Sequence, residues 1–223
     1  MAADPIYELS RKRASRWQRL LQPPLPLIHS AASKRQVLPL GARNLYIGGA
    51  GNRVDGFINV DLYPLPGIDV ACDAEHLPFR DDVFDLVDCN AVIEHTPSPR
   101  ALVGEIRRCV KAGGGCHLVA PFCHPFHEYP KDYWRFTEDG LCELVKPMEI
   151  VETGWQTGPT ATLLITVIEY VKLWMPANWM KKGVWVVLGW VLSPLRYLDL
   201  LLAKRPDIRQ IGNHAYVWAR KSS

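Results

Sequence analysis

The residues best suited to chemistry lie between Asn44 and Thr137, where a glycine loop, two carboxylates and a polar aromatic segment follow one another. The loop at residues 48–51 reads Gly-Gly-Ala-Gly, and glycines allow a sharp turn that brings the backbone close to a ligand. Asp61 and Asp73 each follow an apolar run, where a carboxylate can accept hydrogen bonds from ribose hydroxyls or an adenine amino group. A glycine turn followed by acids at strand ends predicts a nucleoside pocket at the carboxyl edge of a parallel sheet.

Each carboxylate also has a structural interpretation, which the sequence leaves open. Asp61 would then be a turn residue at the surface, and Asp73 would cap a helix. Asp61 comes only ten residues after Gly51, whereas a crossover with its helix usually takes at least about 10 to 12 residues. We therefore expect a short first crossover and a second strand that ends at Asp61.

Three histidines are candidates for a catalytic base, because histidine titrates near neutral pH. His95 lies in the sequence IEH, and His124 and His127 lie in the segment CHPFHEYPKDYWRFT. The structural alternative is that His95 bonds the backbone at a helix start and that the other two pack against nearby aromatic rings. Geometry must decide which of them reaches a substrate.

The same segment offers two candidates for substrate binding, Tyr133 and Arg135. An arginine can bind a carboxylate or phosphate through two parallel hydrogen bonds, although Arg135 could equally pair with Asp132. A zinc site is a further interpretation, and its candidate ligands are Cys123, His124, His127 and Glu128. Their spacing matches no complete ligand set, so we expect no metal ion.

The elements that must position these residues alternate between short apolar strands and helices. The predicted strands are Asn44–Ile47, Phe57–Val60, Ile68–Cys72, Val83–Cys89, Cys116–Ala120, Glu149–Thr153 and Ala215–Ala219. Helices are predicted at Ser98–Lys111, capped by the glycines of KAGGG, and at Thr137–Lys146, ended by Pro147. Short β-branched runs separated by helices or tight loops indicate an α/β fold with a parallel sheet.

Composition favours one folded domain. A chain of 223 residues with 48% hydrophobic content can form a sizeable core, and a net charge of +3 does not demand a nucleic-acid partner. We predict a basic N-terminal segment over residues 1–40, with a helix at Ile6–Leu21, and a folded domain over residues 41–223. The basic residues near that end either contact anions or form a solvated helix face; they are Arg11, Lys12, Arg13, Arg16 and Arg19.

Cysteine usage and the N-terminus predict a cytoplasmic protein. The six cysteines form no CxxC pair, and several lie in apolar runs where a thiol packs as a small hydrophobe. Reduced thiols are therefore expected. The stretch Leu20–Ile28 is interrupted by three prolines, so we identify no secretion signal.

Two strongly apolar stretches, Thr160–Met175 and Val184–Ala203, form a predicted helical insertion over about residues 157–205. Neither is predicted to span a membrane, because the first carries Glu169 and Lys172 and the second carries proline, arginine and aspartate. Four tryptophans lie in and between them. The helices either form a lid on the sheet or lie on a membrane surface as an amphipathic pair.

The motif series resembles a known family. The runs YIGGAG, GFINVD, CDAEHLPF and FDLVDCNAVIEH, the helix ending in VKAGGG and the strand HLVAPF resemble class I S-adenosylmethionine-dependent methyltransferases, in the branch with a shortened first crossover. The resemblance covers about residues 44–143 and the strand near Tyr216. It implies a Rossmann-like sheet, mostly parallel with an antiparallel final strand, and S-adenosylmethionine as cofactor.

By this resemblance, specific residues contact each part of the cofactor. Gly48, Gly49 and Gly51 would pass its methionine end, Asp61 its ribose, Asp73 with Ala74 its adenine, and Asn90 would lie under the sulfonium. Methyl transfer is an in-line displacement, so the protein must mainly align the acceptor and, for an alcohol, remove its proton. His95, His124 and His127 are the candidates for that step.

Two functions follow as hypotheses. The first is a methyltransferase that acts on a small-molecule acceptor, a sugar or a lipid-linked intermediate, with peripheral membrane contact as an open question and no nucleic acid expected. The second is a non-catalytic nucleoside- or lipid-binding protein on the same fold. The second is motivated by the short crossover and by Tyr46, which stands where the family more often has an acid.

Overall fold

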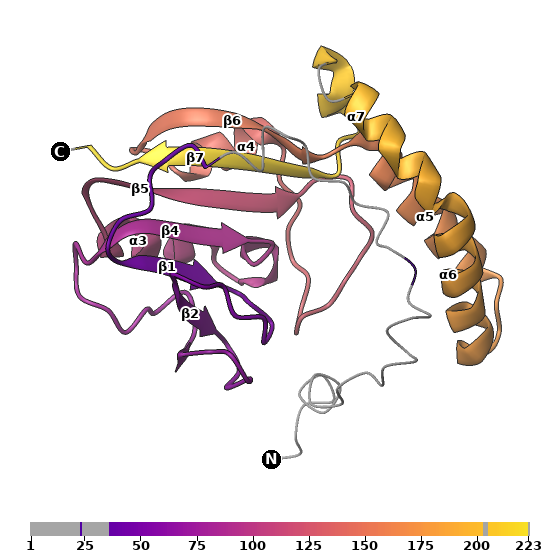
Figure 1. Cartoon of the computed structure of the whole chain (residues 1–223), viewed down its shortest axis with the longest axis horizontal. Helices are drawn as coiled ribbons and strands as arrows, with labels where there is room; N and C mark the ends of the chain where they lie inside the picture. Colours follow the sequence, from indigo (N-terminus) through magenta and orange to yellow (C-terminus); the bar gives the residue numbers. More distant parts are fainter. Residues whose placement is uncertain (1–22, 24–35, 203–204, 223) are drawn as a thin grey trace.

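The computed structural model describes residue 23, residues 36–202 and residues 205–222. The predicted helix at Ile6–Leu21 lies outside these residues. The described part is built on one seven-stranded sheet, in the order β3-β2-β1-β4-β5-β7-β6 (Figure 1). Its strands are β1 (Asn44–Ile47), β2 (Ile58–Asp61), β3 (Val70–Ala71), β4 (Phe84–Asn90), β5 (Val110–Pro121), β6 (Glu149–Thr157) and β7 (His214–Arg220).

Strand directions confirm the predicted mostly parallel sheet with an antiparallel last strand. Strands β1 to β5 pair in parallel, whereas β7 runs antiparallel to both of its neighbours, β5 and β6. The carboxyl ends of β1, β2, β4 and β5 therefore lie along one edge of the sheet. Their following loops meet at that edge, where an open α/β sheet binds its ligands.

The first crossover is short, as predicted. Residues 48–57 contain turns but no helix, and the Gly48 backbone N–H donates to the Val60 carbonyl at 2.8 Å. The loop is thereby held against the end of β2. Because no helix separates β1 from β2, the glycine loop and Asp61 remain close to each other.

Helix α3 (Pro99–Cys109) covers one face of the sheet, with Ser98 as its N-cap. The predicted glycine cap at its C-terminus is wrong. The helix ends at Cys109, Val110 follows in an extended conformation, and β5 begins there, so the KAGGG run lies within the strand. The backbone of the first half of β5 forms hydrogen bonds with β4 and β7. This pairing extends β5 in the N-terminal direction beyond its apolar residues.

The main hydrophobic core lies between the sheet and the helices α3 and α4 (Glu138–Leu144). It includes Leu45, Val87, Ile106, Leu118 and Leu141, all with exposed fractions of 0%. Alternate residues on the strands point to the opposite face, where a smaller cluster forms; that cluster includes Leu86, Val119, Tyr216 and Trp218. The two clusters fix the register of the central strands.

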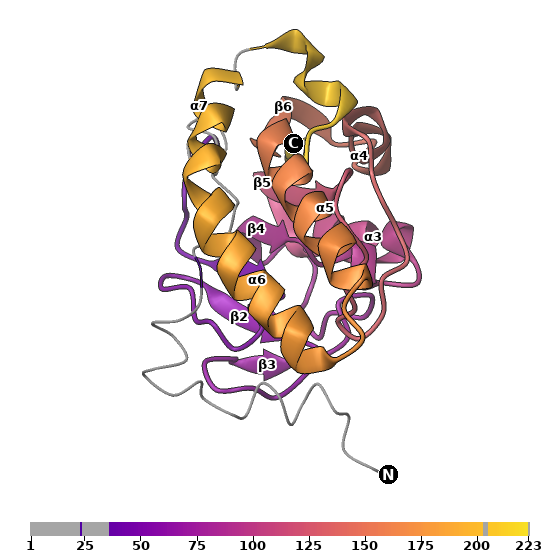
Figure 2. The same ribbon diagram turned by 90° about the vertical axis from the view of Figure 1, so that its right-hand side faces the viewer.

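The predicted helical insertion is present as α5 (Pro159–Leu173), α6 (Asn178–Leu192), η2 (Ser193–Tyr197) and α7 (Leu198–Leu202), and the short η3 (Pro206–Gln210) precedes β7. Figures 1 and 2 show α5 and α6 as a helical hairpin beyond the carboxyl ends of β4 and β5. Asp199 of α7 accepts hydrogen bonds from the backbone N–H groups of Thr160 (2.8 Å) and Ala161 (3.0 Å), which begin α5. This buried carboxylate caps α5 and ties the helices together.

The continuous helical segment Asn178–Leu202 differs from the expectation that neither apolar stretch is suited to span a membrane because of its charged residues and proline. It comprises 25 residues and is long and apolar enough to cross a membrane by length and composition alone. Pro194 lies at the first turn of η2, where a missing backbone N–H is tolerated, so it does not interrupt the segment. The segment also buries little of its surface within the described structure.

Candidate active site

A cavity of about 420 Å³ lies at the carboxyl edge of the sheet. Its walls come from the loop after β1, the ends of β2 and β3, the segment containing η1 (Ile93–His95), and the loop between β5 and α4. Of the residues predicted to form a site, those lining it are Gly48, Asp61, Asp73, Ala74, His95, His127 and Tyr133. Segments far apart in the sequence thus form a single site.

Gly48 meets two local requirements of the loop. Its φ is +85°, which L-residues with side chains rarely adopt, and a Cβ there would lie 1.9 Å from the Val92 Cγ2. Gly49 and Gly51 do not line the cavity. Gly51 also has a positive φ, of +81°, and a Cβ on Gly49 would lie 2.6 Å from the Asn52 carbonyl oxygen, so these two glycines shape the loop from behind.

Asp61 lies at the end of β2 and is nearly fully buried. Its Oδ2 accepts from the Ala50 backbone N–H at 2.8 Å, and its Oδ1 accepts from the Tyr63 backbone N–H at 3.2 Å. Each carboxylate oxygen can accept a further hydrogen bond. Asp61 therefore fixes the glycine loop and still faces the cavity as an acceptor for a pair of hydroxyls.

Asp73 and Ala74 line the same cavity after β3, at the end expected for an adenine ring. Asp73 also accepts from the Glu75 backbone N–H at 2.9 Å, but residues 74–76 form a turn and not a helix, so this is not the helix cap that the sequence left open. Asn90 is placed differently: it ends β4 in register with Val119 and does not line the cavity, whereas Ala91 and Val92 do. The role of each residue toward the cofactor stays a prediction.

His95 and His127 face each other at the cavity wall, with ring centroids 4.9 Å apart. His95 Nδ1 lies 2.6 Å from the Lys131 carbonyl oxygen, and His127 Nδ1 lies 3.1 Å from the Pro125 carbonyl oxygen. The Nε2 atoms of both rings lie close to the buried carboxylate of Glu94. His124 also packs against His127, with ring centroids 4.8 Å apart. The three predicted histidines are thus adjacent, and of them His95 and His127 line the cavity.

The electrostatics of His127 and His124 differ. Burial opposes protonation of His127, but the nearby Glu94 carboxylate, the Pro125 carbonyl and the charge of Asp132 together raise its pKa above the usual value. Burial lowers the pKa of His124, which lies outside the cavity lining with its Nδ1 2.9 Å from the Asn213 Oδ1. The structure therefore does not bring His124 to the cavity.

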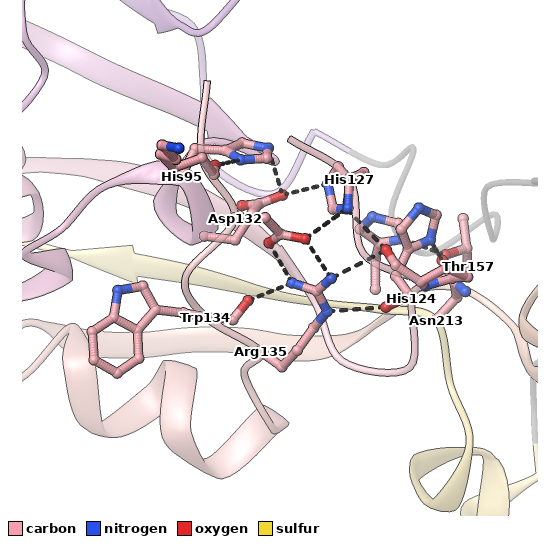
Figure 3. A network of polar contacts seen from close by, with 12 residues as sticks. His95, His124, His127, Asp132, Trp134, Arg135, Thr157 and Asn213 are labelled. Atoms are coloured by element: carbon pink, nitrogen blue, oxygen red, sulfur yellow. Dashed lines mark hydrogen bonds and ion pairs between the residues drawn. The ribbon is translucent and has the colours of Figure 1, made fainter. Parts of the chain in front are cut away.

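Arg135 binds Asp132 rather than facing the cavity. Its Nη1 and Nη2 donate to the two Asp132 oxygens at 2.6 and 2.7 Å, and its Nε donates to the His124 carbonyl at 3.0 Å (Figure 3). This is the structural alternative that the sequence left open. The Asp132 Oδ2 also accepts from the His127 backbone N–H at 2.8 Å, so the pair holds the loop that carries His127.

Sequence reasoning missed Glu94, although it lies in the same IEH run as His95. Glu94 is fully buried, and its carbonyl oxygen accepts from the backbone N–H of Tyr133 at 2.8 Å. The candidate zinc set is also not assembled as expected. Among the described residues, the metal-binding atoms that converge are those of His127, Glu94 and His95; the His124 ring packs against His127 at 4.8 Å but is not part of that group.

Comparison with known proteins identifies part of the chain directly. Residues 58–118 match a family model described as a methyltransferase domain. A demethylmenaquinone methyltransferase from Paenarthrobacter aurescens is 28% identical over 137 residues, which is 58% of this chain. The match spans about half the length of that relative, 50%.

Solved structures share the fold at low sequence identity. A suggested methyltransferase from Bacillus halodurans is 19% identical with a TM-score of 0.52, covering 86% of this chain and 98% of its own. The [4+2]-cyclase SpnF is 17% identical with a TM-score of 0.54, covering 95% and 85%. The fold alone therefore does not fix the reaction.

The cofactor fits the residues present. A cavity of about 420 Å³ is within the usual range for ligand sites, and it combines a glycine loop with a strand-end carboxylate that has free acceptor capacity. The same loop, strand end and η1 region adjoin or lie within the matched residues. Together with the sheet topology, these findings support a class I S-adenosylmethionine-dependent methyltransferase, with S-adenosylmethionine as its cofactor.

Proposed function

We propose that this protein transfers a methyl group from S-adenosylmethionine to a small molecule, a sugar or a lipid-linked intermediate. The observation that supports this best is that one cavity has two chemically different walls. One wall holds Gly48, Asp61 and Asp73, which suit a nucleoside, and the other holds His95 and His127, which suit an acceptor that loses a proton.

On the cofactor side, Asp61 would hold the ribose hydroxyls, Asp73 with Ala74 the adenine, and the backbone near Gly48 the methionine end. The cofactor supplies an electrophilic methyl group on a sulfonium. The chain must exclude water and align the acceptor with that methyl group, because alignment is the main contribution to an in-line displacement. Val92 and Ala91 supply apolar surface at the bottom of the site.

On the acceptor side, the histidines that line the cavity are His95 and His127, with Glu94 close to both rings, and Lys131 lines the same cavity. Tyr133 lines the same wall and offers a hydroxyl for orientation. Together they could hold an acceptor hydroxyl and promote the loss of its proton. This arrangement favours an oxygen acceptor.

An apolar acceptor tail is supported by the helical hairpin beyond the same strand ends. Large hydrophobic side chains remain exposed on it, among them Leu163 (60%), Leu173 (79%), Trp179 (75%) and Leu201 (75%). Exposed apolar side chains gathered on neighbouring helices often mark a surface that binds a partner. A lipid-linked substrate would match a polar site flanked by such helices.

Calorimetry with S-adenosylmethionine and S-adenosylhomocysteine tests the pocket, and a methylation screen over sugar and lipid-linked hydroxyls tests turnover. We expect micromolar binding and a methylated product. In His127→Ala, turnover should fall while cofactor affinity stays within about threefold, or about 0.7 kcal/mol. Binding without any product would favour the non-catalytic alternative, and absence of binding would contradict both functions.

A further inference from the structure

Three side chains with metal-binding atoms converge on the acceptor wall of the cavity. Glu94 and His95 come from η1, and His127 comes from the loop after β5. The Glu94 Oε1 lies 3.7 Å from His95 Nε2 and 3.5 Å from His127 Nε2. One ligand atom from each residue lies within 4.8 Å of the others.

The state of Glu94 is the second, independent observation. Its side chain has an exposed fraction of 0%, and neither carboxylate oxygen has a hydrogen-bond donor among the described residues. A buried carboxylate without such partners is destabilising by several kcal/mol unless a cation compensates it. Buried polar groups without hydrogen bonds are rare, so the two oxygens point to a ligand that would bind them.

The two imidazoles are oriented as metal ligands usually are. A carbonyl oxygen only accepts, so the Nδ1 of His95 and the Nδ1 of His127 each carry a proton toward Lys131 and Pro125, respectively. In the neutral rings, both Nε2 lone pairs then lie near the Glu94 carboxylate. Backbone carbonyls that fix the imidazole tautomer in this way are the common second layer of a metal site.

A proton between the groups fits less well than a metal ion. Charge-assisted N–H···O hydrogen bonds are about 2.7–2.9 Å long, whereas the Nε2 to Oε1 separations are 3.5 and 3.7 Å. Ligands at about 2.0–2.2 Å from a tetrahedral metal ion lie roughly 3.4 Å apart. The observed separations match the second arrangement.

We propose that Glu94, His95 and His127 bind one divalent transition-metal ion of the zinc class. Imidazole ligands favour such ions over Mg²⁺, and three protein ligands leave an open coordination position. Because His95 and His127 line the cavity, that position faces the acceptor. This part rests on the proposed function: the metal would bind the acceptor oxygen and lower the pKa of its hydroxyl, whose proton would pass to solvent, so the histidines act as ligands and not as free bases.

The experiment uses the full chain, freed of metal with a chelator and titrated with ZnCl₂ by calorimetry. We expect one Zn²⁺ per chain, with at least about tenfold weaker binding in Glu94→Gln and in His127→Gln. His76→Gln is the matched control, because His76 has an exposed side chain (82%) outside the cluster. Co²⁺ should give a visible absorption band in the wild type that both cluster variants lose.

Thermal melting keeps the test independent of folding defects. Zn²⁺ should raise the melting temperature of the wild type and leave that of Glu94→Gln unchanged. Without metal, Glu94→Gln should melt at the same temperature as the metal-free wild type or at a higher one, because an unpaired buried charge is removed. Equal Zn²⁺ affinity in wild type and both cluster variants would overturn the site, as would loss of binding in Cys123→Ser alone. Zn²⁺ binding without S-adenosylmethionine binding would leave the metal site standing and remove the proposed function.

Discussion

Asp61 combines two tasks in one carboxylate, since it accepts from the loop at Ala50 and Tyr63 and faces the cavity. We predict that Asp61→Ala weakens S-adenosylmethionine binding by about 1–3 kcal/mol, because the ribose hydroxyls lose a charged acceptor and two backbone N–H groups lose their partner. Calorimetry measures the change. Asp55→Ala is the control, since Asp55 is an exposed carboxylate in the same loop segment. An unchanged dissociation constant for Asp61→Ala would remove it from the cofactor site.

Asp132 should make stability depend on pH at the acid end. Burial alone would raise its pKa, but the hydrogen bonds from Arg135 and the His127 backbone lower it from 3.8 to about 2. The folded state thus binds this proton more weakly than the unfolded state. The resulting stabilisation is complete above about pH 4 and is lost as the pH falls toward 2.

We therefore predict that Asp132→Asn lowers the free energy of unfolding by about 2 kcal/mol at pH 7. The difference from wild type should shrink steadily below pH 4, which urea unfolding at a series of pH values would show. Asp81→Asn is a matched control: Asp81 also pairs with an arginine, at 2.7 Å, but its side chain is 70% exposed, so its loss should matter by less than about 1 kcal/mol. A pH-independent difference for Asp132→Asn would contradict the assigned linkage.

At the scale of elements, the glycine loop after β1 packs against the segment before η1, and both line the cofactor site. We predict that Gly48→Ala destabilises the fold by about 2–5 kcal/mol, of which about 1–2 comes from its positive φ and the rest from a clash with Val92 on the segment before η1. Gly56→Ala separates the two effects, because Gly56 has a φ of +81° but free space around its Cβ position. Chemical denaturation of both variants measures the difference, and equal losses would show that the contact with Val92 is not important.

Element positions were largely predictable from the sequence, because the central strands are short apolar runs whose burial fixes them. Strand β1 matches its predicted bounds, and the antiparallel β7 follows the family resemblance. The helix cap failed because sheet pairing, which local glycine preference does not reveal, extended β5 back to Val110.

The candidate site was predictable only for residues at or just after the carboxyl end of a strand, because the strand itself carries them to the cavity. Asp61 and Asp73 line the cavity for that reason, whereas Asn90 lies one position before the residues that do. In the long loop after β5, the partners of each side chain decide its direction. Arg135 turns to Asp132 and His124 to Asn213, and neither contact has a signal in the sequence. Glu94 was missed because a buried acid cannot be told from an exposed one by its type alone.

At the scale of the whole molecule, the polar site and the exposed apolar helices lie on the same side of the sheet (Figures 1 and 2). The family fold accounts for the first feature, whereas α5 to α7 are an addition whose outer surface has no described partner. Of the two interpretations left by the sequence, we propose contact with lipid, because a lid would need to bury only its inner side. Such contact would bring the site close to a lipid-linked acceptor.

We therefore predict that the protein sediments with vesicles that contain anionic lipid, and less so at high salt, because the basic N-terminal segment adds a screened attraction. Replacing Trp179 and Leu201 together by serine should weaken this binding by at least about tenfold, since two large apolar side chains would lose their burial in lipid. Leu40→Ser is the control: Leu40 is also exposed, at 52%, but it precedes β1 at the opposite edge of the sheet. If the wild type fails to sediment at low salt, the helices are a lid, and a water-soluble acceptor becomes the better substrate class.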